Sequence, residues 1–88
     1  MRRSKLQANI AILHTLAQNG KSITTHIVYD SFLNSSSVNE CLEFLVNQRL
    51  IQKCNDGKRR SYNITDSGLK ALKLAQEIDK SFHVFNVT

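Results

Sequence analysis

Apolar residues recur at intervals of three and four along much of this chain, which is the pattern of amphipathic helices. This spacing runs through residues 4–18, ends at Asn19–Gly20 and returns in residues 38–49 and 69–82. Between the last two stretches, residues 51–64 alternate in polarity, as residues of a half-buried strand do. The pattern therefore predicts a mostly helical chain that is interrupted by one small β element.

The segment that follows the first helix predicts a short link and a second helix. Ser22–Thr24 is rich in β-branched residues, which favours a brief strand or an extended connection. A helix is expected from about Thr25 to Phe32, with Thr24 or Thr25 as its N-cap. Asn34–Ser37 is then the turn before the next helix.

The third predicted helix begins at Ser37, because Ser37 and Glu40 have the spacing of a capping box. A rotation of about 100° per residue gathers its apolar positions on one side. These positions are Val38, Cys41, Leu42, Leu45 and Val46, with Arg49 beside them. The opposite side is polar and consists of Ser36, Glu40, Glu43 and Asn47.

Asp56–Gly57 predicts a tight β-hairpin, because a two-residue turn needs the positive φ that Gly and Asp tolerate. With these two residues in the turn, Cys54 faces Arg59, Lys53 faces Arg60 and Ile51 faces Tyr62. One face of the hairpin would then be rooted in the core by Ile51, Tyr62 and Ile64. The tip would carry the cations Lys58, Arg59 and Arg60.

The fourth helix is predicted from about residue 65 to residue 82, with Thr65 as its N-cap and Asp66 in its first turn. Leu69 and Leu72 lie on the side that would cover the core of the domain. A second apolar stripe lies on a different side and consists of Leu74, Ile78, Phe82 and Phe85. An 88-residue chain has little core for both sides, so this stripe predicts a homodimer, although internal packing of both sides is the simpler alternative.

The predicted order is helix, strand, helix, helix, hairpin, helix, in one domain spanning residues 1–88. This is the winged helix-turn-helix arrangement, which is mainly α with a small β-hairpin, an α+β class. The segments 1–6, 25–29 and 62–68 also resemble small archaeal winged helix-turn-helix transcriptional regulators, which are related to archaeal chromatin proteins that dimerise through their last helix. The resemblance implies DNA binding. Such families usually have Gly near position 49, where this chain has Arg49, so we expect a distorted helix end there.

Charge supports the same hypothesis, because the net charge is +5 and the pI is near 9.6. The cations gather near the N-terminus and around the hairpin. Double-stranded DNA is therefore the expected partner, with phosphate contacts from the wing and the N-terminus and a recognition helix in the major groove. The predicted DNA-binding residues are Arg2, Arg3, Lys5, Ser35, Ser36, Ser37, Asn39, Glu40, Asn47, Lys53, Lys58, Arg59 and Arg60.

Two features of the third helix keep other functions open. Glu40 and Glu43 stand where a DNA reader more often has Lys or Arg, which suits a module that binds a basic protein instead. An architectural chromatin protein that binds all DNA sequences alike is a further alternative. Specific base reading by these two glutamates is the minor hypothesis within the DNA-binding one.

Catalysis, cofactors and membranes are not expected. The sequence has no Gly-rich phosphate loop, no nucleophile and base set, and no pair of His or Cys residues at metal-ligand spacing. Cys41 and Cys54 are interpreted as ordinary thiols of a reducing cytoplasm, where the protein would lie on the nucleoid. No stretch approaches the roughly 20 apolar residues of a membrane span, and no small-molecule substrate is evident. Tyr29 and Tyr62 are expected at the edge of the core.

Overall fold

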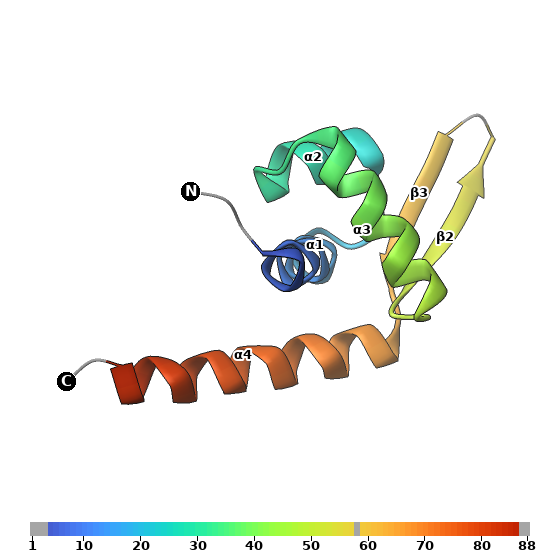
Figure 1. Cartoon of the computed structure of the whole chain (residues 1–88). Helices are drawn as coiled ribbons and strands as arrows, with labels where there is room; N and C mark the ends of the chain where they lie inside the picture. Colours follow the sequence, from blue (N-terminus) through green and yellow to red (C-terminus); the bar gives the residue numbers. More distant parts are fainter. Residues whose placement is uncertain (1–3, 58, 87–88) are drawn as a thin grey trace.

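The computed structural model describes the backbone of residues 4–57 and 59–86, and the side chains of these residues except residue 56 and residues 79–86. Its elements follow the predicted order (Figure 1). They are α1 (Lys5–Asn19), β1 (Ser22–Ile23), α2 (Thr24–Ser31), α3 (Ser35–Asn47), β2 (Ile51–Asp56), β3 (Arg59–Ile64) and α4 (Asp66–Asn86). The predicted fold class, mainly helical with a small antiparallel hairpin, is confirmed.

The three strands form one antiparallel sheet in the order β1-β3-β2. The predicted hairpin register was wrong, because Asp56, which was expected in the turn, belongs to β2. Ile51 lies opposite Ile64, and the last pair is Asp56 with Arg59. Asp56 continues the strand, and Gly57 takes the first loop position with a φ of 63°. Each residue of β2 therefore pairs with a residue of β3 that lies two positions later than predicted. A shift of two residues leaves every side chain on its predicted face.

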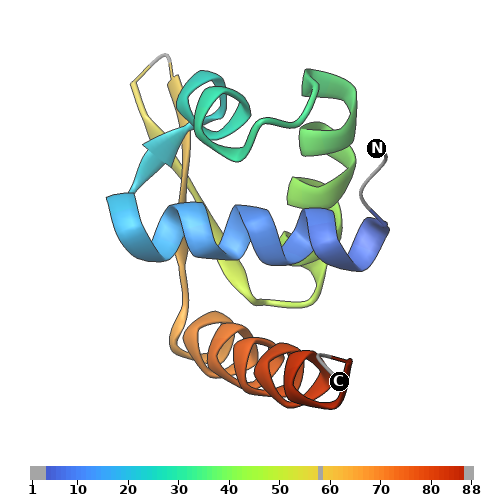
Figure 2. The ribbon, with the colours of Figure 1, turned by 90° about the vertical axis from the view of Figure 1, so that its left-hand side faces the viewer.

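The core lies where α1 crosses the other helices and the base of the sheet (Figure 2). Its largest fully buried side chains are Ile12, Leu16, Ile27, Val38, Leu42 and Leu45. The hairpin adds Ile51 and Tyr62, and α4 adds Leu72. Two expectations were wrong: Tyr29 is 80% exposed, and Leu69 is 45% exposed.

The helix starts differ from the prediction in two of four cases. In α3, Asn34 is the N-cap and its Oδ1 accepts from the Ser37 N–H at 2.8 Å, so the predicted Ser37–Glu40 box was wrong and the helix begins two residues earlier. In α2, the N-cap is Ile23 and no side chain caps the helix, so the predicted threonine cap was also wrong. In α1, Ser4 and Gln7 form a capping box that the sequence reading missed.

The start of α4 is fastened to the end of α3. The predicted cap is confirmed, since the Thr65 hydroxyl accepts from the Gly68 N–H at 3.1 Å. The same hydroxyl lies 2.8 Å from the Arg49 carbonyl and 3.0 Å from the Leu50 carbonyl, to which it donates. Gly68 is required here, because a Cβ at this position would overlap the Leu50 carbonyl oxygen. Arg49 has a φ of 61°, so the expected distortion after the third helix is confirmed.

Candidate nucleic-acid interface

The helix α3 presents its polar side to solvent, because its apolar side is buried against α1 and α2. Val38, Cys41, Leu42 and Leu45 anchor it in the core. Six predicted contact residues lie on this helix, and five of them are exposed, namely Ser35, Ser36, Asn39, Glu40 and Asn47, while Ser37 is half-buried. The start of α3 and the tip of the hairpin therefore lie at one end of the molecule, opposite α4 (Figure 2).

The hairpin β2–β3 is the wing, and its described cations are exposed. Arg60 lies opposite Asn55, and Arg59 lies opposite Asp56. Since alternate residues of a strand point to opposite faces, these two arginines extend from both faces of the ribbon. Lys53 is exposed further down β2. Lys58 lies outside the described residues, so the prediction for it stays a prediction.

A hollow of about 530 Å³ joins the wing to the start of α2. Its lining consists of Ile23, Thr24, Thr25, His26, Arg59 and Arg60. The first turn of a helix carries free N–H groups and a partial positive charge, and here no side chain caps it. Arg59 and Arg60 are both among the lining residues, so positive charge lies near this helix start, as in a phosphate cradle.

Sequence reasoning missed Thr24, Thr25 and His26 as candidate contacts. It assigned the threonines to capping, which would have satisfied the N–H groups that the structure leaves open. The signal that could have found them is the order of the elements. A helix that starts directly after a strand pairing with the wing must place its first turn beside that wing.

The N-terminal basic cluster is separate from the wing. Lys5 is exposed at the start of α1, and together with Glu40 and Glu43 it lines a hollow between α1 and α3. Arg2 and Arg3 lie outside the described residues. Among the described cations, Arg59 and Arg60 lie side by side at one site, and Lys5 belongs to a different one.

The predicted dimerisation stripe is exposed as far as its side chains are described. Leu74 is 58% exposed and Ile78 is 52% exposed. Ala71 and Ala75 are half-buried between the stripe and the core-facing side. Phe82 and Phe85 fall in the part of α4 whose side chains the structure leaves undescribed. Two large aliphatic side chains therefore lie open on the same helix.

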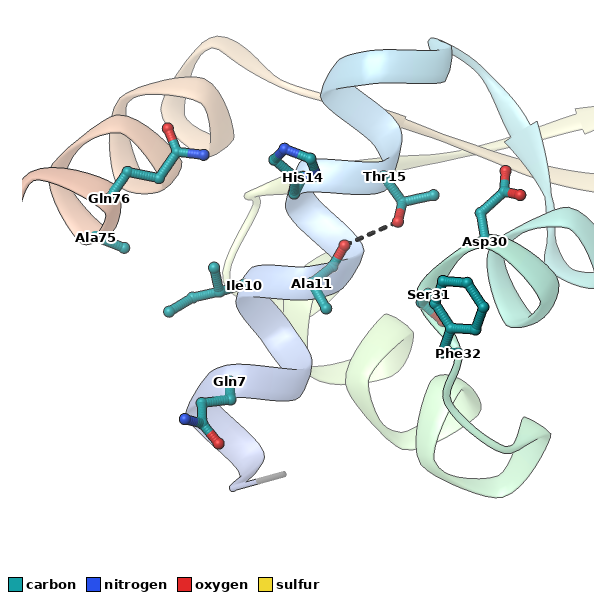
Figure 3. Close-up of a pocket in the computed structure, with 10 residues that line it drawn as sticks. All are labelled: Gln7, Ile10, Ala11, His14, Thr15, Asp30, Ser31, Phe32, Ala75 and Gln76. Carbon is teal, nitrogen blue, oxygen red and sulfur yellow. Dashed lines mark hydrogen bonds between the residues drawn. The ribbon is translucent and has the colours of Figure 1, made fainter. Parts of the chain in front are cut away.

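A further hollow, of about 590 Å³, lies between α1, the end of α2 and the middle of α4 (Figure 3). His14 and Asp30 line it, and the Thr15 hydroxyl turns away from solvent to donate to the Ala11 carbonyl at 2.9 Å. In the part of the chain that the structure describes, no three His, Cys, Asp or Glu residues are placed to hold a metal ion. Its described helices also include none with the length and apolarity that a membrane crossing requires.

These elements define a helix-turn-helix followed by a basic β-wing, and the sequence comparison identifies the class. The chain belongs to the winged helix-turn-helix family, which it matches over residues 2–82. The resemblance inferred from the sequence is thereby confirmed at the level of this family. Among proteins with curated descriptions, none is a significant match.

Solved structures with the same fold include DNA-binding proteins and regulators. Sso10a-2, a DNA-binding protein from Sulfolobus solfataricus, is 19% identical, with a TM-score of 0.77 over 93% of this chain and 87% of that one. A MarR family transcriptional regulator from Silicibacter pomeroyi is 21% identical, with a TM-score of 0.78 over 92% of this chain. The present chain spans only 57% of that regulator's length. The Zα domain of Carassius auratus PKZ, solved with Z-DNA, is 28% identical, with a TM-score of 0.65 over 72% of this chain and all of that domain.

Proposed function

We propose that this chain binds double-stranded DNA as a small transcriptional regulator and has no catalytic role. The observation that carries the proposal is the hollow where Arg59 and Arg60 meet the uncapped start of α2. Two cationic residues and a helix N-terminus line the same hollow, which suits contact with the phosphate backbone. The exposed residues at the start of α3 lie at the same end of the molecule (Figure 2).

In this proposal, the α3 helix lies in the major groove and the wing holds the backbone. Ser35, Ser36 and Asn39, at the start of the helix, are suited to phosphate oxygens and base edges. Glu40 and Glu43 repel phosphates, so they contribute little to general affinity. Binding energy then comes mainly from the wing and the helix start, and sequence preference comes from few contacts on α3.

We further propose that two protomers act together through the exposed stripe on α4. Leu74 and Ile78 would pack against their copies in a partner chain. Two wings and two recognition helices would then meet a site with two-fold symmetry, about 34 Å apart. An archaeal source and a place on the nucleoid in the cytoplasm complete the proposal, and the likeness of this fold to Sso10a-2 supports them.

The proposal is tested by fluorescence anisotropy with random duplex DNA at low and moderate salt. The double variant Arg59→Glu/Arg60→Glu should bind every sequence at least about tenfold more weakly, because it turns two attractions into repulsions. A matched control is Lys70→Glu/Lys73→Glu on α4, which changes the net charge equally at exposed positions away from the wing. This control should lose much less affinity.

The same titration separates the alternatives. A protein-interaction module would show no salt-sensitive DNA binding, and this result would overturn the proposal. An architectural protein would bind unrelated sequences with similar affinity. A regulator instead prefers particular sites by about 10³-fold or more, which selection from a random DNA pool would reveal.

A further inference from the structure

The hollow between α1 and α3 is a second candidate site, distinct from the cradle beside the wing. It encloses about 540 Å³, which lies in the range of small-molecule sites. Its lining consists of Lys5, Leu6, Asn9, Glu40, Cys41, Glu43, Phe44 and Asn47. Residues of both α1 and α3 thus contribute to one concave surface next to the proposed recognition face.

The floor and one wall of this hollow are apolar. Leu6 on α1 is 68% exposed and Phe44 on α3 is 50% exposed, which is unusual for two large apolar side chains that line the same hollow. Cys41 is buried and also lines the hollow, and the pKa of its thiol is raised mainly by this burial and further by the Glu40 carboxylate, while Lys5 lowers it. The thiol is therefore neutral near pH 7 and adds to the apolar floor.

The polar groups of the hollow include the donors of Lys5, Asn9 and Asn47 beside several acceptors. The Asn9 Oδ1 atom is buried and has no hydrogen-bond partner in the described structure. Glu40 and Glu43 are exposed at positions three apart on α3, so their carboxylates project from adjacent turns. The two carboxylates favour a donor that carries positive charge. Lys5 supplies one cation at this lining, which leaves a net charge of −1 among its ionisable groups.

We propose that this hollow binds a small organic cation with an apolar body, of the class of primary arylalkyl amines. The apolar body would cover Leu6 and Phe44, and the ammonium group would donate to the carboxylates of Glu40 and Glu43. Its charge complements the lining, whereas a neutral or anionic ligand of the same shape leaves the acceptors unpaired. The site gives the two carboxylates of α3 a role other than contact with DNA.

A consequence for DNA rests on the proposed function. A bound monocation offsets one of the two negative charges that Glu40 and Glu43 place on the proposed recognition helix, so it should raise DNA affinity about three- to tenfold. By linkage, DNA should raise the affinity for the cation by the same factor. The amine would then act as a co-regulator at the recognition helix itself.

The site is tested without DNA, by titrating the labelled protein in amide NMR with 2-phenylethylammonium and with 2-phenylethanol. The two probes share the apolar body and differ in charge. We expect the ammonium to bind at least about tenfold more tightly, with shifts at residues of α1 and α3 that line the hollow. Equal binding of the alcohol, or shifts confined to other parts of the chain, would overturn the proposal.

Variants that keep the side-chain shape but remove its charge test whether Glu40 and Glu43 bind the ammonium group. Glu40→Gln/Glu43→Gln should bring the ammonium to the affinity of the alcohol, and Glu77→Gln on α4 should leave the preference unchanged. An unchanged preference in the double variant would exclude these carboxylates as the site. A DNA titration with saturating ammonium then tests the coupling alone. Cation binding with no change in DNA affinity would keep the site and reject the co-regulator role.

Discussion

At the scale of single residues, the junction of α3, β2 and α4 depends on two backbone conditions. Gly68 lies so close to the Leu50 carbonyl that no side chain fits, and Arg49 has positive φ without being glycine. The Thr65 hydroxyl and N–H bind the carbonyls that this arrangement exposes. The junction therefore explains physically why Thr65 and Gly68 occupy their positions.

We expect Gly68→Ala to destabilise the protein by about 2 kcal/mol or more, because the new methyl group must push α4 away from the Leu50 carbonyl. Ser67→Ala is the matched control, since Ser67 is exposed in the same helical turn. It should change stability by less than about 0.5 kcal/mol. Chemical denaturation of both variants measures the difference, and similar midpoints would contradict the close approach.

We expect Arg49→Gly to stabilise the chain by up to about 1 kcal/mol, because glycine has no penalty at a φ of 61°. The neighbouring Gln48 has a φ of −84°, so Gln48→Gly should have the opposite sign. The melting temperatures of the two variants provide the test. A loss of stability in both would show that position 49 lies in the ordinary helical region.

At the scale of elements, hydrophobic spacing predicted α1, α3 and α4, and the Asp56–Gly57 signal predicted the hairpin, whereas of the predicted side-chain caps only that of Thr65 is confirmed. Ser37 and Glu40 have the spacing of a capping box, but the actual N-cap is Asn34, three residues earlier, which ends the α2–α3 turn. Several polar residues in a row made the start ambiguous. The hairpin turn was likewise predicted one residue too early. Asp56 was expected in the turn but belongs to β2, and the sequence did not distinguish the two because Asp and Gly both tolerate positive φ.

Asn34→Ala should therefore destabilise the protein by about 1 kcal/mol, because the first turn of α3 loses the acceptor for the Ser37 N–H. Ser37→Ala keeps that bond and should have an effect of less than about 0.5 kcal/mol. Urea denaturation of the pair distinguishes the two possible caps. A larger loss for Ser37→Ala would favour the capping box instead.

The candidate contact residues could also be predicted only in part from the sequence. Exposure of the residues on α3 follows from helical periodicity, which the sequence contains. The cradle of Thr24, Thr25 and His26 with Arg59 and Arg60 does not, because it depends on the pairing of β1 with β3. Pairing between segments about 40 positions apart has no local signature in the chain.

At the scale of the whole molecule, the separation of cations into a wing and an N-terminal cluster predicts a definite response to salt. If Lys58, Arg59, Arg60 and one or two N-terminal cations each meet a phosphate, log affinity should fall with log salt at a slope of about 4 per protomer. Arg59→Gln/Arg60→Gln should lower that slope by about 2. Titrations at several salt concentrations measure both values, and a flat response would contradict the phosphate contacts.

The exposed stripe of α4 predicts the oligomeric state. Leu74→Gln/Ile78→Gln should convert a dimer into a monomer, because each change removes apolar area from the proposed contact. Tyr29→Gln is the control, since Tyr29 is 80% exposed on α2, away from α4. Sedimentation velocity gives the mass of each variant. A monomeric parent chain, or an unchanged mass in the double variant, would reject α4 as the contact.

The sheet order β1-β3-β2 places β2 at an outer edge, where its backbone groups can accept another strand. The exposed residues on this edge are Gln52, Lys53 and Asn55, and none of them favours edge-to-edge stacking. Strongly polar side chains here should keep the protein from aggregating through its ribbon at high concentration. Replacing Lys53 with a β-branched apolar residue would therefore endanger its solubility before it affected its stability.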